Sequence, residues 1–317
     1  MTMKDLAKVC NVSVATVSKA FSGADDVSKD TKDHIFKVAK ENGCFNKFNK
    51  GKYQKKVIAV ILPEIGGNYY IKYAEILAGK IEKENCICLI AKCDFSPEKH
   101  EALIEYFCEF CKVDGIITFH FRGEKKDYKT PIISLYSGND NVDNIKIDEI
   151  KAFKKAMNLL LNYGHKHIAF FGEPLTKGRA NRFKEVAKEL NHKDIYIVNT
   201  NKRFEKAGED CVKKLPKNVT AIICAYDKIA LGTIKALQKK GLSVPHDISV
   251  IGVDNISETE YISSSLTSIG PDIEKLCNMA WTTLKKKIRS PYYKSRTKPV
   301  IEAELFIRES VAKNPHR

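Results

Sequence analysis

The sequence predicts an α/β protein, in which a small all-α unit at the N-terminus precedes a body of parallel β-sheets. Two observations support this fold class. Up to residue 46, apolar residues recur at helical spacing in short segments separated by turn residues. From Val57 onward, short apolar runs alternate with amphipathic helical segments, which is the pattern of βαβ units. Roughly 260 residues of this alternation exceed one ordinary domain, so we expect the body to have two lobes.

Capping residues define the N-terminal helices. Thr2 precedes the first helix, and Asp5 follows it at the spacing of a capping box. Ser13 and Ser28 are hydroxyl N-caps of the second and third helices. We therefore expect helices over residues 3–10, 14–21 and 28–42, the last two ended by Gly23 and Gly43.

A lysine-rich segment follows these helices. Residues 47–56 carry five lysines and no acidic residue, and we interpret them as a linker between an N-terminal domain (residues 1–46) and the body (residues 57–317). A solvated tether would have this composition. So would a segment that follows a phosphate backbone, because each lysine that contacts a phosphate releases a counterion.

The elements of the body are predicted from the period of their apolar residues. Apolar runs of strand length predict strands, and longer stretches with helical spacing predict helices. Parallel sheets bind ligands beyond the carboxyl ends of their strands, so polar residues that follow a strand are candidate ligand contacts. The expected strands are 57–62, 87–91, 115–119, 131–135, 167–171, 195–198, 221–224 and 248–253, and the expected helices are 69–84, 97–112, 149–162, 179–190, 204–215 and 228–240.

The charge of the chain favours a polyanionic partner. The formal net charge is +15 and the sequence pI is about 9.2. A lysine-rich composition alone produces such values, so charge is only supporting evidence.

The ten cysteines do not form a recognisable metal site. Cys108 and Cys111 make a lone CxxC within a helical segment, whereas a zinc site needs a second pair. The N-terminus lacks the pattern of a signal peptide, and no apolar run approaches the ~18 residues of a membrane span. We therefore expect a cytoplasmic protein with reduced thiols, no metal, no cofactor and no membrane association.

The first forty residues resemble a known family. The run MKDLAKVCNVSVATVSKAFSG, followed by VSKDTKDHIFKVAKENG, is similar to the helix-turn-helix DNA-binding domain of the lactose-repressor (LacI-type) regulators. Later blocks, among them VDGIITF, NYGHKHIAFFGEPL and SVIGVDN, resemble the body of that family in the same order. The resemblance implies two periplasmic-binding-protein-like lobes, with the chain crossing between them near Asp148, Pro271 and Tyr292.

The resemblance also implies which residues contact DNA. Val14 and Ala15 match base-contacting positions of the second helix, and Lys19 stands where the family usually has Arg or His. Lysine lacks the planar fork with which arginine reads guanine. An acid at Asp26 is unexpected so near DNA. The positions that match phosphate-contacting or capping residues are Thr2, Ser13, Thr16 and Ser18.

A second set of residues matches the family's effector pocket. Asp254 follows a predicted strand, and Arg179 matches the arginine of an Arg-x-x-Gly-aromatic motif, in which Arg182 replaces the glycine. Carboxylates and guanidinium groups bind several ligand hydroxyls at once, and aromatic rings cover apolar ring faces. The remaining matches are Tyr69, Tyr70, Asp148 and Tyr226.

These observations predict a transcriptional regulator, most simply a repressor, that acts as a homodimer on a double-stranded DNA operator. A small-molecule effector, a sugar or related metabolite, would bind between the lobes. The alternative is a ligand-binding sensor with weak or non-specific DNA binding, because the linker lacks the family's Ala-Arg-x-x-Leu pattern. We expect no enzyme activity, since no Walker loop or nucleophile elbow is present.

Overall fold

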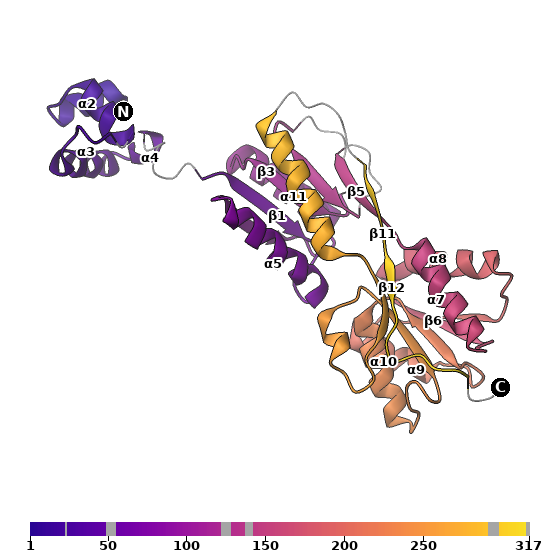
Figure 1. Ribbon diagram of the computed structural model, residues 1–317. Coiled ribbons are helices and arrows are strands. Elements are labelled where there is room, and N and C mark those ends of the chain that lie inside the picture. The colour runs from indigo at the N-terminus through magenta and orange to yellow at the C-terminus, as the bar shows by residue number, and fades with distance from the viewer. Residues whose placement is uncertain (23, 49–54, 122–127, 137–141, 291–297, 315–317) are drawn as a thin grey trace. The chain divides into compact units, whose positions relative to one another are not determined.

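The computed structural model describes residues 1–22, 24–48, 55–121, 128–136, 142–290 and 298–314 (Figure 1). The chain divides into two compact units. The headpiece comprises Met1–Val57 with Asn85–Ile87, and the body comprises Ile58–Glu84 with Cys88–Arg317. Within the described residues, no helix is both long and apolar enough to span a membrane.

The headpiece contains the three predicted helices and a fourth, short one. These are α1 (Met3–Val9), α2 (Val14–Ser22), α3 (Lys29–Glu41) and α4 (Phe45–Phe48). The predicted caps are confirmed. Thr2 and Asp5 exchange hydrogen bonds as a capping box, and the hydroxyls of Ser13 and Ser28 accept from the backbone N–H groups of Thr16 and Thr31.

Helix α4 extends the core of the headpiece into the segment expected to be linker. The ring of Phe21 lies 5.8 Å from those of Phe45 and Phe48, and Phe36 packs edge-on against Phe45 at 5.4 Å. Phe48 is only 8% exposed. Burial of these rings against α2 and α3 explains why a four-residue helix forms in a lysine-rich segment.

The first sheet of the body has the strand order β11-β5-β4-β3-β1-β2. Each strand pair with a described register (β1/β3, β3/β4, β4/β5 and β5/β11) is parallel. Helices α5 (Asn68–Lys83) and α11 (Ile273–Arg289) pack against each other, and α11 also contacts β3 and β4. The strands are β1 (Val57–Leu62), β2 (Ile87–Lys92), β3 (Gly115–Phe119), β4 (Ile132–Leu135), β5 (Asp143–Asp148) and β11 (Val300–Glu302), and α6 (Pro97–Glu105) continues into a π-helix (Tyr106–Phe110).

The second sheet has the strand order β12-β10-β9-β8-β6-β7. Its strands are parallel except β12, which runs antiparallel to β10. The strands are β6 (Ile168–Gly172), β7 (Ile195–Asn199), β8 (Ala221–Cys224), β9 (Ser249–Val253), β10 (Thr267–Gly270) and β12 (Glu304–Phe306). The helices are α7 (Ile150–Asn162), α8 (Lys177–Glu189), α9 (Glu205–Lys213) and α10 (Asp227–Lys239), with 3-10 turns at Pro174–Thr176 and Ser257–Glu260.

The chain passes between the two sheets at three places in the described residues. It crosses after Asp148, between β10 and α11, and at Ala303 between β11 and β12. The last crossing lies later than the one expected near Tyr292, a residue outside the described ranges. The reason is that β11 first pairs with β5, with Val300 opposite Lys146, before the chain turns into the second lobe.

A close contact between α9 and α10 fixes where these two helices of the second lobe begin. A Cβ on Gly232 of α10 would lie 1.9 Å from the carbonyl oxygen of Glu205 in α9, so only glycine permits this approach. The residues just before these two helices, Phe204 and Tyr226, are thereby held side by side, with their ring centroids 6.2 Å apart.

Candidate functional site

Of the residues predicted to contact DNA, all but the half-buried Thr16 are exposed on the headpiece. Val14, Ala15, Ser18 and Lys19 are exposed on α2, whereas Val17, Ala20 and Phe21 of the same helix are buried. Val14 is 42% exposed although it is apolar. Small side chains at the start of an exposed helix allow that end to approach base edges in a major groove. Thr2 and Ser13 are exposed N-caps, and Thr16 is half-buried beside Ser13.

Lys19 is not free on this face. Its ammonium group forms an ion pair with the carboxylate of Asp26, and both side chains are about half exposed, at 53% and 54%. The hydrogen bond from Lys19 lowers the pKa of Asp26, so the carboxylate is charged at neutral pH. The one basic residue predicted to read bases is therefore held by an acid of the same unit.

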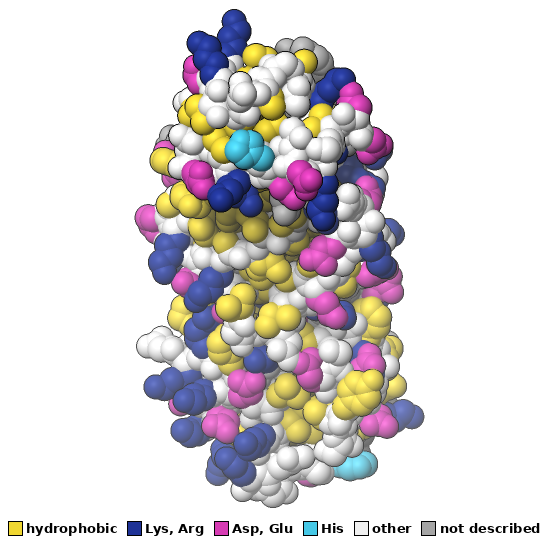
Figure 2. Space-filling view, turned by 90° about the vertical axis from the view of Figure 1, so that its left-hand side faces the viewer, with side chains coloured by type: hydrophobic (Ala, Val, Ile, Leu, Met, Phe, Trp, Pro, Cys, Tyr) yellow, Lys and Arg dark blue, Asp and Glu magenta, His cyan; other side chains and the backbone are white. Residues whose placement is uncertain are grey.

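The surface charge is mixed on the face drawn in Figure 2. Lysine and arginine side chains are interspersed there with aspartate and glutamate. On this face, the net charge of +15 does not gather into one basic patch.

The body encloses a cavity of about 680 Å³ lined by residues of both lobes. Of the residues predicted to bind an effector, Tyr69, Tyr70, Arg179, Tyr226 and Asp254 line it. Asp148 does not: its carboxylate accepts a hydrogen bond from the backbone N–H of Ile150, at the start of α7. Asp148 is thus an end-of-strand residue whose side chain is turned to the following helix.

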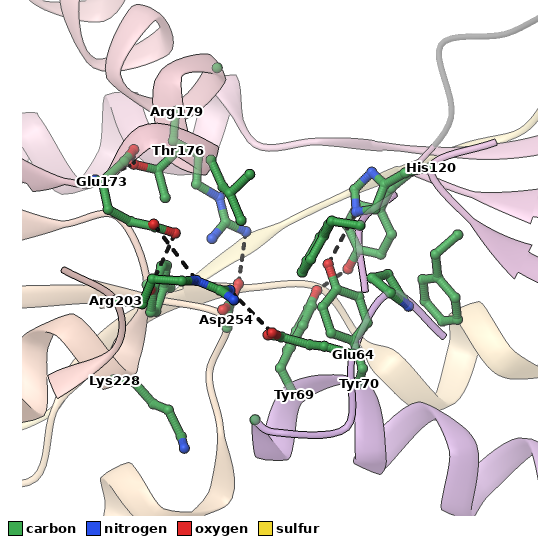
Figure 3. A pocket seen from close by; sticks show the side chains of 18 of the residues that line it. Glu64, Tyr69, Tyr70, His120, Glu173, Thr176, Arg179, Arg203, Lys228 and Asp254 are labelled. Atoms are coloured by element: carbon green, nitrogen blue, oxygen red, sulfur yellow. Dashed lines mark hydrogen bonds and ion pairs between the residues drawn. The ribbon is translucent and has the colours of Figure 1, made fainter. Parts of the chain in front are cut away.

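Arg179 joins two carboxylates, Glu149 and Asp254, inside the cavity, and Figure 3 shows its contact with Asp254. One of its terminal nitrogens lies 2.7 Å from Asp254 Oδ1 and 2.9 Å from Glu149 Oε1, and the other donates to the carbonyl oxygen of Ala225 at 2.7 Å. Arg182, one helical turn later, donates to Glu149 Oε2 at 2.7 Å. Glu149 and Asp254 are both buried, so these hydrogen bonds satisfy charges that water does not reach well.

Burial and these pairs shift the pKa of the carboxylates in opposite directions. Burial raises the pKa of Asp254 to about 6, against the opposing effect of Arg179. Burial would also raise the pKa of Glu149, but the two arginines outweigh it, and the result is a lowered value. Glu149 is therefore a fixed anion, whereas Asp254 titrates close to neutral pH.

The loop that carries Asp254 is held by a buried carboxylate. Asp254 has a φ of 108°, which is unusual for a residue other than glycine. Asp227 accepts hydrogen bonds from the backbone N–H of Ile256 at 2.8 Å and from the hydroxyl of Ser268 at 2.6 Å. The same hydroxyl accepts from the backbone N–H of Asn255. Asp227 thus fixes the conformation that points Asp254 into the cavity.

Tyrosine hydroxyls form the polar part of the first-lobe wall. Tyr69 and Tyr73 of α5 both hydrogen-bond to the hydroxyl of Tyr136, and Tyr70 lies 3.1 Å from His120 Nε2. Burial raises the pKa of all four tyrosines above their ordinary value. They are therefore neutral hydroxyls, able to donate and accept hydrogen bonds.

Arg203 crosses between the lobes at the rim of the cavity (Figure 3). Its guanidinium lies 3.1 Å from Glu64 of the first lobe and 3.8 Å from Glu173 of the second. It also lies over the rings of Phe95 and Phe204, at 5.8 and 4.6 Å from their centroids. We call this set the Arg203 bridge.

Sequence reasoning missed several of these residues. Glu149, Arg203, Glu64 and Tyr136 reach the cavity from four separate segments, and none belongs to a motif. Their approach depends on the packing of the two lobes. Arg182 was visible in the sequence as a substitution for glycine, which is a signal that the wall of the cavity differs here.

Among the described residues, no group of three or more His, Cys, Asp or Glu side chains is placed to hold a metal ion. All ten cysteines are free thiols, and seven of them are buried.

Known proteins match both units of the chain. Residues 2–43 match the model of bacterial regulatory proteins of the lacI family, and residues 157–311 match a periplasmic binding protein-like domain. The chain is 26% identical to the HTH-type transcriptional regulator DegA of Bacillus subtilis, over 98% of each chain. It is also 26% identical to the HTH-type transcriptional repressor CytR of Escherichia coli, over 99% of this chain and 97% of that one.

Solved structures share the fold. The lac repressor dimer bound to operator and an anti-inducer superposes with a TM-score of 0.72 at 18% identity, over 98% of this chain and 99% of that one. A LacI family regulator from Enterococcus faecium with bound ribose gives 0.71 at 24% identity, over 81% of this chain and 99% of that one. The relatives named here are regulators and not enzymes, in agreement with the expectation from the sequence. With both of its units matched, the chain combines a DNA-binding domain of the lacI type with a periplasmic binding protein-like domain, and the relatives that it resembles are bacterial transcriptional regulators.

Proposed function

We propose that this protein is a DNA-binding transcriptional repressor whose operator affinity is controlled by a small molecule, a sugar or related metabolite, bound between the two lobes. The observation that carries the proposal is the buried Glu149–Arg179–Asp254 network, which lines a cavity shared by both lobes. Asp254 Oδ2 and the tyrosine hydroxyls are groups that could exchange hydrogen bonds with several ligand hydroxyls at once.

The DNA-binding part of the proposal depends on the exposed face of α2. Its contacts would be Val14, Ala15 and Lys19 with base edges, and Thr2, Ser13, Thr16 and Ser18 with phosphates. A homodimer would place two such helices on the half-sites of a near-palindromic operator. The solved lac repressor, a dimer on its operator, supports this assembly by analogy. We assign the protein to the cytoplasm because bacterial operators are located there.

Effector and DNA would communicate through the relative position of the lobes. Each ligand favours one arrangement of the body, so each changes the affinity for the other by the same factor. Bound ribose in the Enterococcus faecium relative supports a sugar-like effector for this chain.

A salt titration tests the DNA-binding function. Fluorescence anisotropy is measured with an operator selected from genomic DNA and with random DNA, at KCl concentrations from about 50 to about 300 mM. Non-specific binding, which is driven by counterion release, is lost over this range, so the series separates it from specific binding. We expect specific binding to persist near physiological salt and to weaken in Lys19→Ala. Equal affinity for operator and random DNA would favour the alternative, a sensor without specific DNA recognition.

A thermal-shift screen of sugars and metabolites tests the effector site. Bound ligand stabilises the folded chain, so a true effector raises Tm, and the rise grows with the logarithm of the ligand concentration above Kd. We expect Asp254→Asn to abolish the shift and Lys188→Gln, an exposed change at the far end of α8, to preserve it. A ligand whose shift survives Asp254→Asn would place the effector elsewhere.

A further inference from the structure

The wall of the cavity carries an arginine where the family motif has glycine. Arg179 and Arg182 stand one turn apart on α8, and both point to Glu149. A glycine at position 182 would leave Glu149 paired with Arg179 alone. The substitution therefore adds a full positive charge to this wall and removes the space that glycine would leave.

Arg182 retains donors that the protein does not use. Arginine has five N–H donors in a planar fork. Within the described part of the chain, its one ion pair is with Glu149 Oε2, through one terminal nitrogen. The side chain of Arg182 is 37% exposed, compared with 18% for Arg179. Arg179 is occupied by three protein oxygens, whereas Arg182 can still receive a ligand.

Lys146 adds another cation to the same wall of the cavity. It lies on β5, lines the cavity and is half-buried, and it has no ion pair among the residues that the structure describes. Near the lobe crossing, the lining thus has three cations, Arg179, Arg182 and Lys146. Of the acids there, Glu149 and Asp254 pair with arginine, and Asp227 accepts hydrogen bonds from the loop that carries Asp254. A partly buried cation without a partner is unfavourable, and an anionic ligand group removes that cost.

At the rim of the cavity, in contrast, the cations are already paired with carboxylates. The Arg203 bridge sets one guanidinium between two carboxylates, Glu64 and Glu173, and Lys228 lies 3.7 Å from Glu205. Anions are therefore disfavoured at the rim and favoured at the wall formed by Arg182 and Lys146.

We propose that the effector is an anionic sugar derivative whose carboxylate or phosphate group binds to Arg182 and Lys146, while its hydroxyls bind to Asp254. This inference depends on the proposed function, since it concerns the chemistry of the same cavity. The planar fork of Arg182 matches the paired oxygens of either group, and Lys146 acts as a point charge.

Matched series of neutral and anionic sugars test whether the cavity prefers an anionic ligand. Isothermal titration calorimetry on the full-length protein uses glucose, glucuronate and glucose 6-phosphate, with the corresponding galactose series and with ribose and ribose 5-phosphate. We expect one anionic member to bind at least about tenfold more tightly than its neutral parent, a difference of about 1.4 kcal/mol. The carboxylate and phosphate arms show which anion the wall accepts.

Single-residue variants test which side chains cause the preference for an anionic ligand. Arg182→Gln and Lys146→Gln should each abolish the preference for the anionic member, and Lys184→Gln, which removes an exposed charge from the same helix, should preserve it. Circular dichroism confirms that each variant is folded. Tighter binding of a neutral sugar, lost in Asp254→Asn, would overturn this inference and leave the proposed function standing. If no sugar or sugar derivative binds, the sugar effector and the anionic subsite both fail.

Discussion

At the scale of single residues, the buried carboxyl of Asp254 makes the stability of the fold depend on pH. Its buried carboxyl has a pKa near 6 in the folded chain, compared with an ordinary value of 3.8. Between these values the folded state binds more protons than the unfolded state, so this group makes stability fall as pH rises through the interval. The loss is of the order of 1–3 kcal/mol and is complete above about pH 7.

We therefore expect Asp254→Asn to change the pH dependence of stability. Asparagine does not titrate, so the stability of the variant relative to the native protein should increase between about pH 4 and pH 6.5 and then level off. Urea unfolding of both proteins at a series of pH values measures this difference. A constant difference across the range would show that Asp254 keeps its ordinary pKa.

A second residue-scale prediction concerns the Lys19–Asp26 pair. Asp26→Asn removes an acid that holds Lys19 and repels phosphates, so both operator and random DNA should bind several-fold more tightly. Anisotropy titrations at fixed salt measure the gain. Asp25→Asn is the matched control, because Asp25 is an exposed neighbour without a described ion pair. An unchanged affinity in Asp26→Asn would mean that Lys19 does not face the DNA.

The sequence predicted those site residues that follow a strand or lie in a motif. Asp254 follows β9 directly, and Arg179 belongs to a family pattern, so both were found. Glu149 and Arg203 were not, because nothing local distinguishes them from other surface charges. Their roles arise only when the two lobes place Glu149 against Arg179 and Arg203 against Glu64.

At the scale of elements, α4 changes the interpretation of the linker. Its rings complete the headpiece core, so Phe45 and Phe48 belong to the folded headpiece and not to a solvated tether. The sequence pattern did not predict this packing, because lysines at every second or third position indicate an exposed segment. Nothing in that pattern indicates that the two phenylalanines pack inward.

We expect Phe48→Ala to destabilise the headpiece by about 3 kcal/mol, the usual cost of deleting a buried aromatic ring. Hydrogen exchange measured by mass spectrometry on the full-length protein should show faster exchange in peptides from α1 to α3 and no change in the body. Lys37→Ala, an exposed change on α3, is the control. Unaltered exchange of α1 to α3 in Phe48→Ala would mean that the ring lies outside the core.

The sequence predicted the strands that are fully buried and missed a strand that forms only because neighbouring strands pair with it. The runs at β1 and β8 are apolar throughout, β3 has one polar residue, Thr118, and all three were identified. Strand β5, with the sequence DNIKID, is polar at alternate positions and was missed. It becomes a strand because β4 and β11 pair with both of its edges.

At the scale of the whole body, the Arg203 bridge stabilises the closed arrangement of the two lobes. Arg203 is 39% exposed and Glu64 16%, so the pair contributes about 1 kcal/mol. That is roughly a fivefold change in the ratio of closed to open bodies. Because the contact is made by protein atoms alone, it contributes with or without an effector.

Glu64→Gln should therefore shift the body toward the open arrangement. Distances between spin labels placed on the two lobes, measured by pulsed electron resonance, should lengthen, and effector affinity should fall up to about fivefold. In a double-mutant cycle with Arg203→Gln, the double variant should lose less than the sum of the two single variants, because the contact between Arg203 and Glu64 is already broken in each single variant. If the losses simply add, the two residues are not coupled.

An ion pair that is partly open to solvent is also sensitive to dissolved salt. The Debye length shortens from about 10 Å at 0.1 M to about 3 Å at 1 M, so the Arg203 bridge weakens as ionic strength rises. The midpoint of the effector dose response should then move to higher concentration at high ionic strength, even with the DNA step left out of the assay. A regulator built this way would respond to its metabolite and, through one arginine, to the osmotic condition of the cell.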